Sequence, residues 1–570
     1  MNNALRDTDS GKSPPPCADL RPPDEVMRLE RMGAAFPTRL SFMRSLLRHL
    51  AREKATVSRT LWQINDTGFG RAVYQVRWAD HVYSLVAFAT DLPEDKRTDR
   101  VIAEAWDTSY VLFDGVPDDD DRDRLAANAP RQEAGRFDER DLILSRANKS
   151  VRLFSHVIER LASGRQPDID QVRGIGYLMR TTAVYGNGKF GIADRAVIAG
   201  RPGLDGPFAA EMLLVWLIRG FTHDLVEHIA ERRNPERFVP LDKELKRFLG
   251  IGNATGLGMA PFLVSHPILL HNWIMARETA LARVRALETA SAETKARAQQ
   301  LLARMEQHLA QWSVDDERQM HRIATLRSEI PDFRAGLDDA LWQAQYPWQR
   351  LLERAQRYSL ECQELIVALV LEPHGDLVDD VVATMSSDVE LRLLPTMRLA
   401  ELARHLKAAF GFALDIDFAD KAETAQFWYV SEEKLEPRLG LRDEEDGAEL
   451  EMPLDIARQV QALARDLAAT DQGETVAAFL LRHPEHRYAV TRVQTAASHP
   501  YSEIRDNLIA RTCLPIDMLR LKLSFFGASK FDPRSDRWTR ITLYQGAPLF
   551  DELKPGTADD WWMPTLDKAS

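Results

Sequence analysis

Cysteine is scarce in this sequence. The only three, Cys17, Cys362 and Cys513, lie far apart and form no CxxC pair. They allow at most one disulfide, which excludes a disulfide scaffold and a cysteine-based zinc site. Cys362 and Cys513 lie in apolar segments with helical spacing, where a thiol is usually an inert core residue. This cysteine usage is typical of a reducing compartment, and we predict a cytoplasmic protein.

Long hydrophobic runs are absent as well. The most apolar segments, residues 212–218 and 365–371, are much shorter than the ~20 residues that cross a bilayer. The polar, proline-rich N-terminus has neither the apolar core of a signal peptide nor the composition of a transit peptide. We therefore predict a soluble protein with no membrane partner, in which residues 1–30 form a disordered tail.

The chain also lacks an excess of positive charge. Its net charge is −12 over 570 residues, and an acidic surface repels nucleic acids and anionic membranes. Lys530, Arg534 and Arg537 lie beside Trp538, but one short basic stretch in an acidic protein is more often a solvated loop than a nucleic-acid site. We predict no nucleic-acid partner.

The residues that are present predict a mainly α fold with a small N-terminal antiparallel β-meander, an α+β class. Residues 59–65, 71–78 and 81–90 are rich in Val, Tyr, Trp and Thr and are separated by short turns, which is the pattern of a meander. A fourth strand is predicted at residues 107–113, and residues 38–54 have the apolar spacing of an amphipathic helix.

Helical periodicity dominates from residue 140 onward. The predicted helices span residues 140–162, 168–183, 208–232, 267–288, 292–313, 341–371 with breaks, 396–409, 454–468 and 504–526. Short strands are predicted at residues 426–430 and 537–544.

A chain of this length predicts two to four folded units. We divide it into the tail, a helix with the meander (31–135), a helical core region that contains the predicted pocket (136–430), and a C-terminal helical region with a short strand (431–570).

The first candidate site is a glycine-rich turn between two predicted helices. Residues 185–191 contain three glycines, which let the backbone approach a ligand closely. The N–H groups of such a turn, beside the ammonium of Lys189 and the amide of Asn187, suit a carboxylate or phosphate. Tyr185 and Asp194 complete the group. The alternative is an ordinary turn whose polar residues face water.

A second glycine-rich segment, residues 250–262, has neither GxGxxG nor GxxxxGK[ST] spacing, which excludes a dinucleotide or P-loop assignment. We interpret it as a loop that brings Asn253 and Thr255 to the substrate. His266 and His271 follow it, and they are the candidate acid and base because imidazole titrates near neutral pH. Alternatively, the loop only lets two helices cross closely.

The third candidate is the predicted helix 208–232. Its first half is apolar all round, which implies burial, and Glu211 and Arg219 flank that half. Buried charges need partners. Arg219 is therefore predicted to help bind an anion, and Glu211, together with Tyr185, is predicted to assist catalysis.

The second half of the same helix carries Asp224, Glu227, His228 and Glu231 on one face. A carboxylate and an imidazole four residues apart can share a metal ion. Such a stripe is more often a solvated face, and we predict no metal ligand among these residues.

Together these features favour a soluble enzyme that acts on a small anionic organic molecule. Its pocket would lie where the two glycine-rich segments meet the buried helix. One alternative is a non-catalytic helical interaction protein, which would have a broad apolar surface and no pocket. A second is a metal-dependent hydrolase built on Asp224 and His228. The sequence does not specify a reaction, a cofactor or an oligomeric state.

Overall fold

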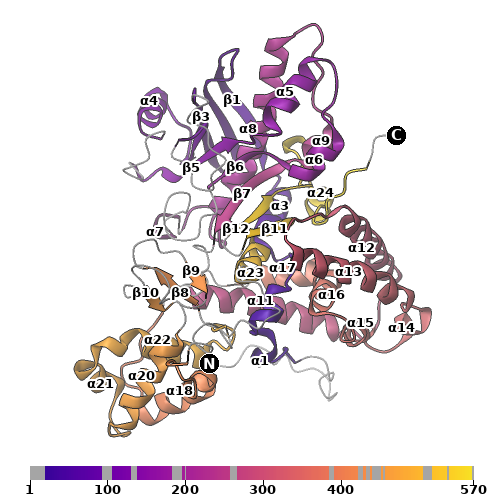
Figure 1. Cartoon of the computed structure of the whole chain (residues 1–570). Coiled ribbons are helices and arrows are strands. Elements are labelled where there is room, and N and C mark those ends of the chain that lie inside the picture. The colour runs from indigo at the N-terminus through magenta and orange to yellow at the C-terminus, as the bar shows by residue number, and fades with distance from the viewer. Residues whose placement is uncertain are drawn as a thin grey trace.

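The computed structural model describes the chain except for residues 1–18, 93–104, 130–137, 183–194, 199, 257–265, 384, 386–390, 421–427, 432–436, 440–450, 454–455, 505–516, 536–537 and 568–570. Helices are the dominant elements of the described chain, and they are accompanied by a large sheet and a small one (Figure 1). The predicted fold class, mainly helical with a β-section, is confirmed. No helix among the described residues is long and apolar enough to cross a bilayer.

The large sheet contains nine strands within the described residues, in the order β1-β2-β3-β4-β5-β6-β7-β12-β11. The strands are β1 (Thr56–Ile64), β2 (Gly70–Trp78), β3 (His81–Ala89), β4 (Thr108–Asp114), β5 (Asp141–Lys149), β6 (Tyr177–Thr181), β7 (Gly250–Gly256), β11 (Lys530–Ser535) and β12 (Trp538–Leu543). Neighbouring strands are antiparallel except for the parallel pair β6–β7. The sheet thus joins segments from both ends of the chain (Figure 1).

The predicted meander is confirmed as β1 to β4, and the predicted strand 537–544 is confirmed as β12. Three other strands contradict the sequence-based expectation. β5 occupies part of the predicted helix 140–162, β6 part of the predicted helix 168–183, and β7 part of the predicted glycine-rich loop. Each of these three strands pairs on both sides, so tertiary pairing overrides local helix or loop preference.

Helices cover both faces of the first half of the sheet. α8 (Ala209–Arg233) packs on strands β3 to β7, while α4 (Asp119–Asn128) covers the other face near Val86 and Val111. Because β3 is buried on both faces, its sequence is a nearly continuous apolar run instead of an alternating one. Asp118 and Asp121 form a capping box at the start of α4.

The remaining helices share the main hydrophobic core with the sheet; α5, α6 and α9 lie beside its upper part, and α12 to α16 form a separate group (Figure 1). The remaining helices are α1 (Pro23–Val26), α2 (Leu29–Gly33), α3 (Phe42–Arg52), α5 (Phe154–Ala162), α6 (Ile169–Ile175), α7 (Arg195–Ile198), α9 (Lys243–Phe248), α11 (Pro267–Arg285), α12 (Ala292–Gln311), α13 (Glu317–Ala335), α14 (Asp339–Gln343), α15 (Pro347–Ala355), α16 (Leu360–Leu371), α17 (Gly375–Ala383), α23 (Asp517–Phe526), η6 (Phe550–Glu552) and α24 (Pro555–Asp559).

A separate, smaller core is built from helices between residues 399 and 498 (orange in Figure 1). Its elements are α18 (Leu399–Leu414), α20 (Ala457–Ala468), α21 (Val476–Arg482), the 3-10 turn η5 (Pro484–His486) and α22 (Arg487–Ser498). The short strands β8 (Trp428–Ser431), β9 (Pro437–Leu439) and β10 (Glu451–Pro453) form a second sheet, and β8 confirms the strand predicted at 426–430. The domain boundaries predicted at residues 135 and 430 remain a prediction.

The predicted tail is too long, because residues 19–30 belong to the folded part. Val26, Met27 and Leu29 are buried in the main core. Arg21 enters a buried ion network, where its guanidinium lies 2.7 Å from Glu278 and 3.0 Å from Glu364. These contacts fasten the N-terminal segment to α11 and α16.

Two further arginines complete this network. Arg31 of α2 lies 2.8 Å from Glu364, and Arg277 of α11 donates to the other oxygen of the same carboxylate. Burial alone would raise the pKa of Glu364, but the attraction of Arg21, Arg277 and Arg31 holds that pKa well below its usual range. One carboxylate thus compensates charges from three separate segments.

Candidate functional site

A small pocket rich in positive charge lies on the second half of the large sheet. We call it the basic pocket, and its charged residues are Lys149, Arg152, Arg180, Lys530, Arg540 and Asp532. Its volume is about 70 Å³, room for about five water molecules. A phosphate or carboxylate group fits this space, and the rest of a larger molecule would extend outward.

The strand register explains why these side chains meet. Residues paired across neighbouring strands point to the same face of a sheet. Arg180 of β6 is in register with Gly252 of β7, Gly252 with Thr542 of β12, and Thr542 with Lys530 of β11. These four residues form one row across four strands. A second row, Ala254, Arg540 and Asp532, lies beside it.

Glycine residues of β7 lie at the base of the pocket and have no side chains that would fill it. Side chains alternate between the faces of a strand, so Gly250 and Gly252 of β7 both belong to the pocket face. A Cβ atom at Gly252 would lie 2.5 Å from the ring of Tyr177, far inside contact distance. Glycine is therefore required at position 252, because the Tyr177 ring lies directly against the β7 backbone.

The five cations of the basic pocket greatly outweigh its one carboxylate. The Lys149 ammonium lies 3.7 Å from Asp107, and that of Lys530 donates to the Gly174 carbonyl at 3.0 Å. Within the described chain, the guanidinium groups of Arg152 and Arg540 make no side-chain hydrogen bond. A guanidinium can bind a carboxylate or phosphate through two parallel hydrogen bonds.

Burial shifts the pKa values of two groups in the pocket toward neutral pH. Burial raises the pKa of Asp532 to about 6, against the opposing attraction of Lys530 and Arg540. Burial also lowers the pKa of Lys530. A carboxylate that titrates near neutral pH can accept or donate a proton under physiological conditions. The pocket therefore combines anion-binding groups with an acid/base group.

Four of the residues predicted from sequence, Tyr185, Asn187, Lys189 and Asp194, lie outside the described residues. So does the side chain of Thr255, although its backbone belongs to β7.

Asn253 is buried in β7 on the opposite face from Gly252, in register with Ile541. It therefore faces away from the basic pocket.

Arg219, predicted to bind an anion, has main-chain partners instead. It is buried in the middle of α8, and its donors reach the carbonyl oxygens of residues 246, 247, 249, 547 and 548 at 2.8 to 3.1 Å. Burial lowers the pKa of Arg219 to about 9, so the group stays charged at neutral pH. Its contacts join α9 and the start of β7 to the segment after β12. Glu211, near the start of the same helix, is also buried.

The two candidate histidines lie at and near the start of α11. His266 is the half-buried residue that precedes the helix. His271 is buried; its Nδ1 accepts a hydrogen bond from the Tyr501 N–H at 3.2 Å, and its ring packs on His499. Burial, aided by His499, lowers the pKa of His271 to about 4. The residue is therefore a neutral imidazole at physiological pH.

This shift predicts a pH dependence of stability. The pKa of His271 is about 4 in the folded state and about 6.5 in an unfolded chain. Its contribution is therefore complete above pH 6.5 and is lost as the pH falls from 6.5 to 4, by about 3 kcal/mol. Urea unfolding between pH 4 and 7 measures this loss. A His271→Asn variant, which keeps a hydrogen-bond acceptor, should show a flatter profile; an unchanged slope would contradict the assignment.

The carboxylates and imidazole in the second half of α8 contact separate partners. Asp224 accepts hydrogen bonds from Tyr74 at 2.6 Å and Arg59 at 2.9 Å. His228 pairs with the indole N–H of Trp62 and the Asn65 carbonyl. These contacts fasten α8 to β1 and β2.

No protein-family model matches the chain, and neither a curated protein nor a solved structure does. The interpretation of the site therefore comes from its own residues.

The sequence did not identify the basic pocket. One signal was present, because Lys530 and Asp532, and likewise Arg540 and Thr542, alternate as residues on one strand face do.

Proposed function

We propose that this protein is an enzyme that acts on a small organic anion, whose phosphate or carboxylate group binds in the basic pocket. The observation that carries the proposal is the convergence of five cationic side chains and one buried carboxylate on a space of about 70 Å³. Arg180 and Arg540 stand on either side of the glycine floor and bind the anion. Asp532 transfers a proton, and its raised pKa suits that role.

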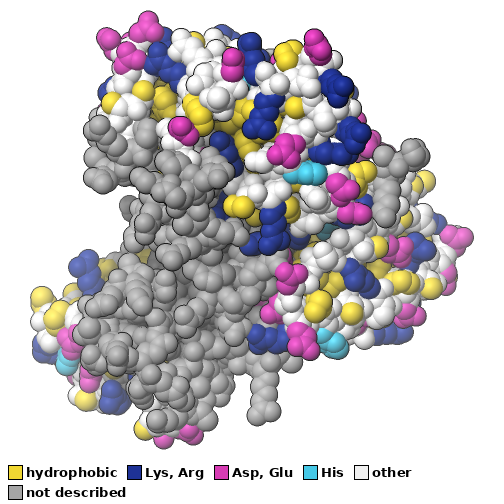
Figure 2. Space-filling view, turned by 45° about the horizontal axis from the view of Figure 1, so that its top comes forward, with side chains coloured by type: hydrophobic (Ala, Val, Ile, Leu, Met, Phe, Trp, Pro, Cys, Tyr) yellow, Lys and Arg dark blue, Asp and Glu magenta, His cyan; other side chains and the backbone are white. Residues whose placement is uncertain are grey.

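The alternative, a non-catalytic interaction protein, would have a broad apolar surface. Large apolar side chains that are exposed in the described chain are scattered over separate elements; they are Val116, Val151, Met320, Leu394, Leu481 and Tyr488. On the face in Figure 2, acidic and basic side chains are interspersed, and hydrophobic ones occur in small groups. This surface favours a pocket-based function.

Binding tests the anion site directly. Inorganic phosphate, pyrophosphate and a library of phosphate esters and carboxylates are screened by thermal shift, since a ligand of the folded state raises the unfolding midpoint. For the best ligand, we expect Arg540→Gln to weaken binding ~10-fold or more, because a charge-assisted hydrogen bond contributes about 1.5–3 kcal/mol. Arg77→Gln is the matched control: it removes the same charge from an exposed position on β2 of the same sheet. Equal affinities of the Arg540 and Arg77 variants would refute the site.

The Asp532→Asn variant separates an enzyme from a binding protein. It keeps the shape of the side chain but cannot transfer a proton. We expect it to retain the ligand and to lose turnover, while the parent's rate should depend on a group with a pKa near 6. Unchanged turnover in Asp532→Asn would exclude Asp532 as the acid/base residue.

A further inference from the structure

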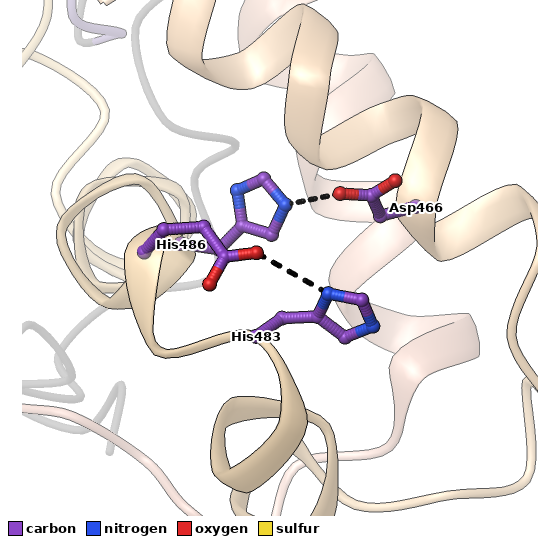
Figure 3. A group of neighbouring side chains, drawn as sticks. Asp466, His483 and His486 are labelled. Carbon is purple, nitrogen blue, oxygen red and sulfur yellow. Dashed lines mark hydrogen bonds and ion pairs between the residues drawn. The ribbon is translucent and has the colours of Figure 1, made fainter.

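Four side chains with metal-binding atoms meet in the smaller helical core, away from the basic pocket. Asp466 comes from α20, and His483, Glu485 and His486 come from the turn between α21 and α22. One ligand atom from each residue lies within 4.8 Å of those of the other three. Figure 3 shows the two imidazoles and the Asp466 carboxylate pointing toward one another.

The local sequence explains how one turn presents two imidazoles together. His483 is the C-cap residue that follows α21, and Pro484 begins the 3-10 turn η5. The chain turns back across η5, and the ring centroids of His483 and His486 lie 6.0 Å apart. The buried ring of Phe479 stacks against both imidazoles, with centroid distances of 4.8 Å and 5.8 Å. The positions of both rings are thus set by packing.

A bound cation would replace two contacts that the cluster makes within itself. His486 Nε2 lies 2.6 Å from Asp466 Oδ2, and His483 Nδ1 lies 3.3 Å from Glu485 Oε1.

We propose that Asp466, His483, Glu485 and His486 bind one transition-metal dication of the Zn²⁺ type. Two imidazole nitrogens with two carboxylate oxygens suit Zn²⁺, whereas Ca²⁺ and Mg²⁺ prefer oxygen ligands alone. Zn²⁺ bonds of ~2.0–2.2 Å require the ligand atoms to move closer together. Glu485, whose side chain is 60% exposed, is free to swing inward, while His486 is buried and fixed.

Binding would strengthen the link between α20 and the α21–α22 turn that the His486–Asp466 pair already makes. An open hollow of about 380 Å³ adjoins the cluster and is lined by Asp466, Thr470, Glu474 and His483 among others. Solvent therefore reaches one side of the ion, and the metal can enter and leave without unfolding of the chain.

Metal titration of the full chain tests the proposal. After treatment with EDTA and its removal, Zn²⁺ alone is titrated by calorimetry and Co²⁺ by visible absorption. We expect one ion per chain and a Co²⁺ spectrum typical of four-coordinate nitrogen and oxygen ligation. His483→Gln and Glu485→Gln, both at accessible positions, should each weaken Zn²⁺ binding ~10-fold or more, since even the loss of an outer contact to a metal ligand costs about that much.

His405→Gln is the matched control, because His405 pairs with Glu401 on α18 of the same helical unit and lies outside the cluster. It should bind Zn²⁺ like the parent. Circular dichroism of each variant verifies the fold. The proposal is refuted if the parent shows no saturable Zn²⁺ binding, or if the folded His483→Gln and Glu485→Gln proteins bind as tightly as the His405→Gln protein.

Discussion

Replacing Glu364 with glutamine is expected to lower the free energy of unfolding by about 3–5 kcal/mol, the range found when one partner of a buried ion pair is removed. The carboxylate is fully buried and contacts Arg21, Arg31 and Arg277. Glutamine has the shape of glutamate but no charge. Glu278, which pairs with Arg21, is then the remaining buried carboxylate beside the three guanidinium groups. Urea unfolding of the parent and variant measures the difference.

Glu353→Gln provides the comparison for this prediction. Glu353 pairs with Arg350 on the surface of α15, where both side chains are largely exposed. An exposed pair of this kind contributes little, so the unfolding midpoint should barely move. If Glu364→Gln were as mild as Glu353→Gln, the buried network would have no important role in stability.

The second large effect is expected from Arg219→Met. Methionine fills similar space but cannot donate to the five carbonyl groups that Arg219 reaches. The Arg247 and Pro548 carbonyls keep donors in Gly546 and Trp216, but a buried carbonyl left without any donor costs about 1–3 kcal/mol. We expect a loss of about 3–5 kcal/mol in unfolding free energy, with Arg219→Lys intermediate because an ammonium has fewer donors.

Trp216 allows this unfolding to be followed locally. It lies in α8 one turn before Arg219, and its indole N–H donates to the Pro548 carbonyl at 3.3 Å. The fluorescence of Trp216 should therefore report the release of the segment after β12, against a background variant that lacks this tryptophan. A methionine variant as stable as the parent would show that water replaces the guanidinium at these carbonyl groups.

The sequence was informative where strands pair with their neighbours in the chain. β1 to β4 follow one another through short connections, and their alternating or continuous apolar patterns reflect the faces they bury. It was misleading where the partner is distant. Residues 250–256 contain three glycines, which are depleted in strands, yet Gly252 is needed because Tyr177 packs on it.

The candidate site was harder to predict for the same reason. Arg180 and Arg540 meet only because β12 pairs with β7 and β7 with β6, and no local pattern specifies pairing over such separations. The metal cluster had one readable signal, two histidines three apart around Pro484. Asp466, its partner on α20, could not be recognised from spacing alone.

The position of β12 has a consequence for protein synthesis. Roughly 280 residues separate β7 from β12, and a ribosome adding ~5–20 residues per second needs about 15–60 s to translate them. Until residue 543 has left the exit tunnel, one edge of β7 has no strand beside it. An open edge of this kind pairs readily with other extended chains. The nascent polypeptide therefore exposes an aggregation-prone strand edge for about 15–60 s, and a protecting chaperone is most valuable in that interval.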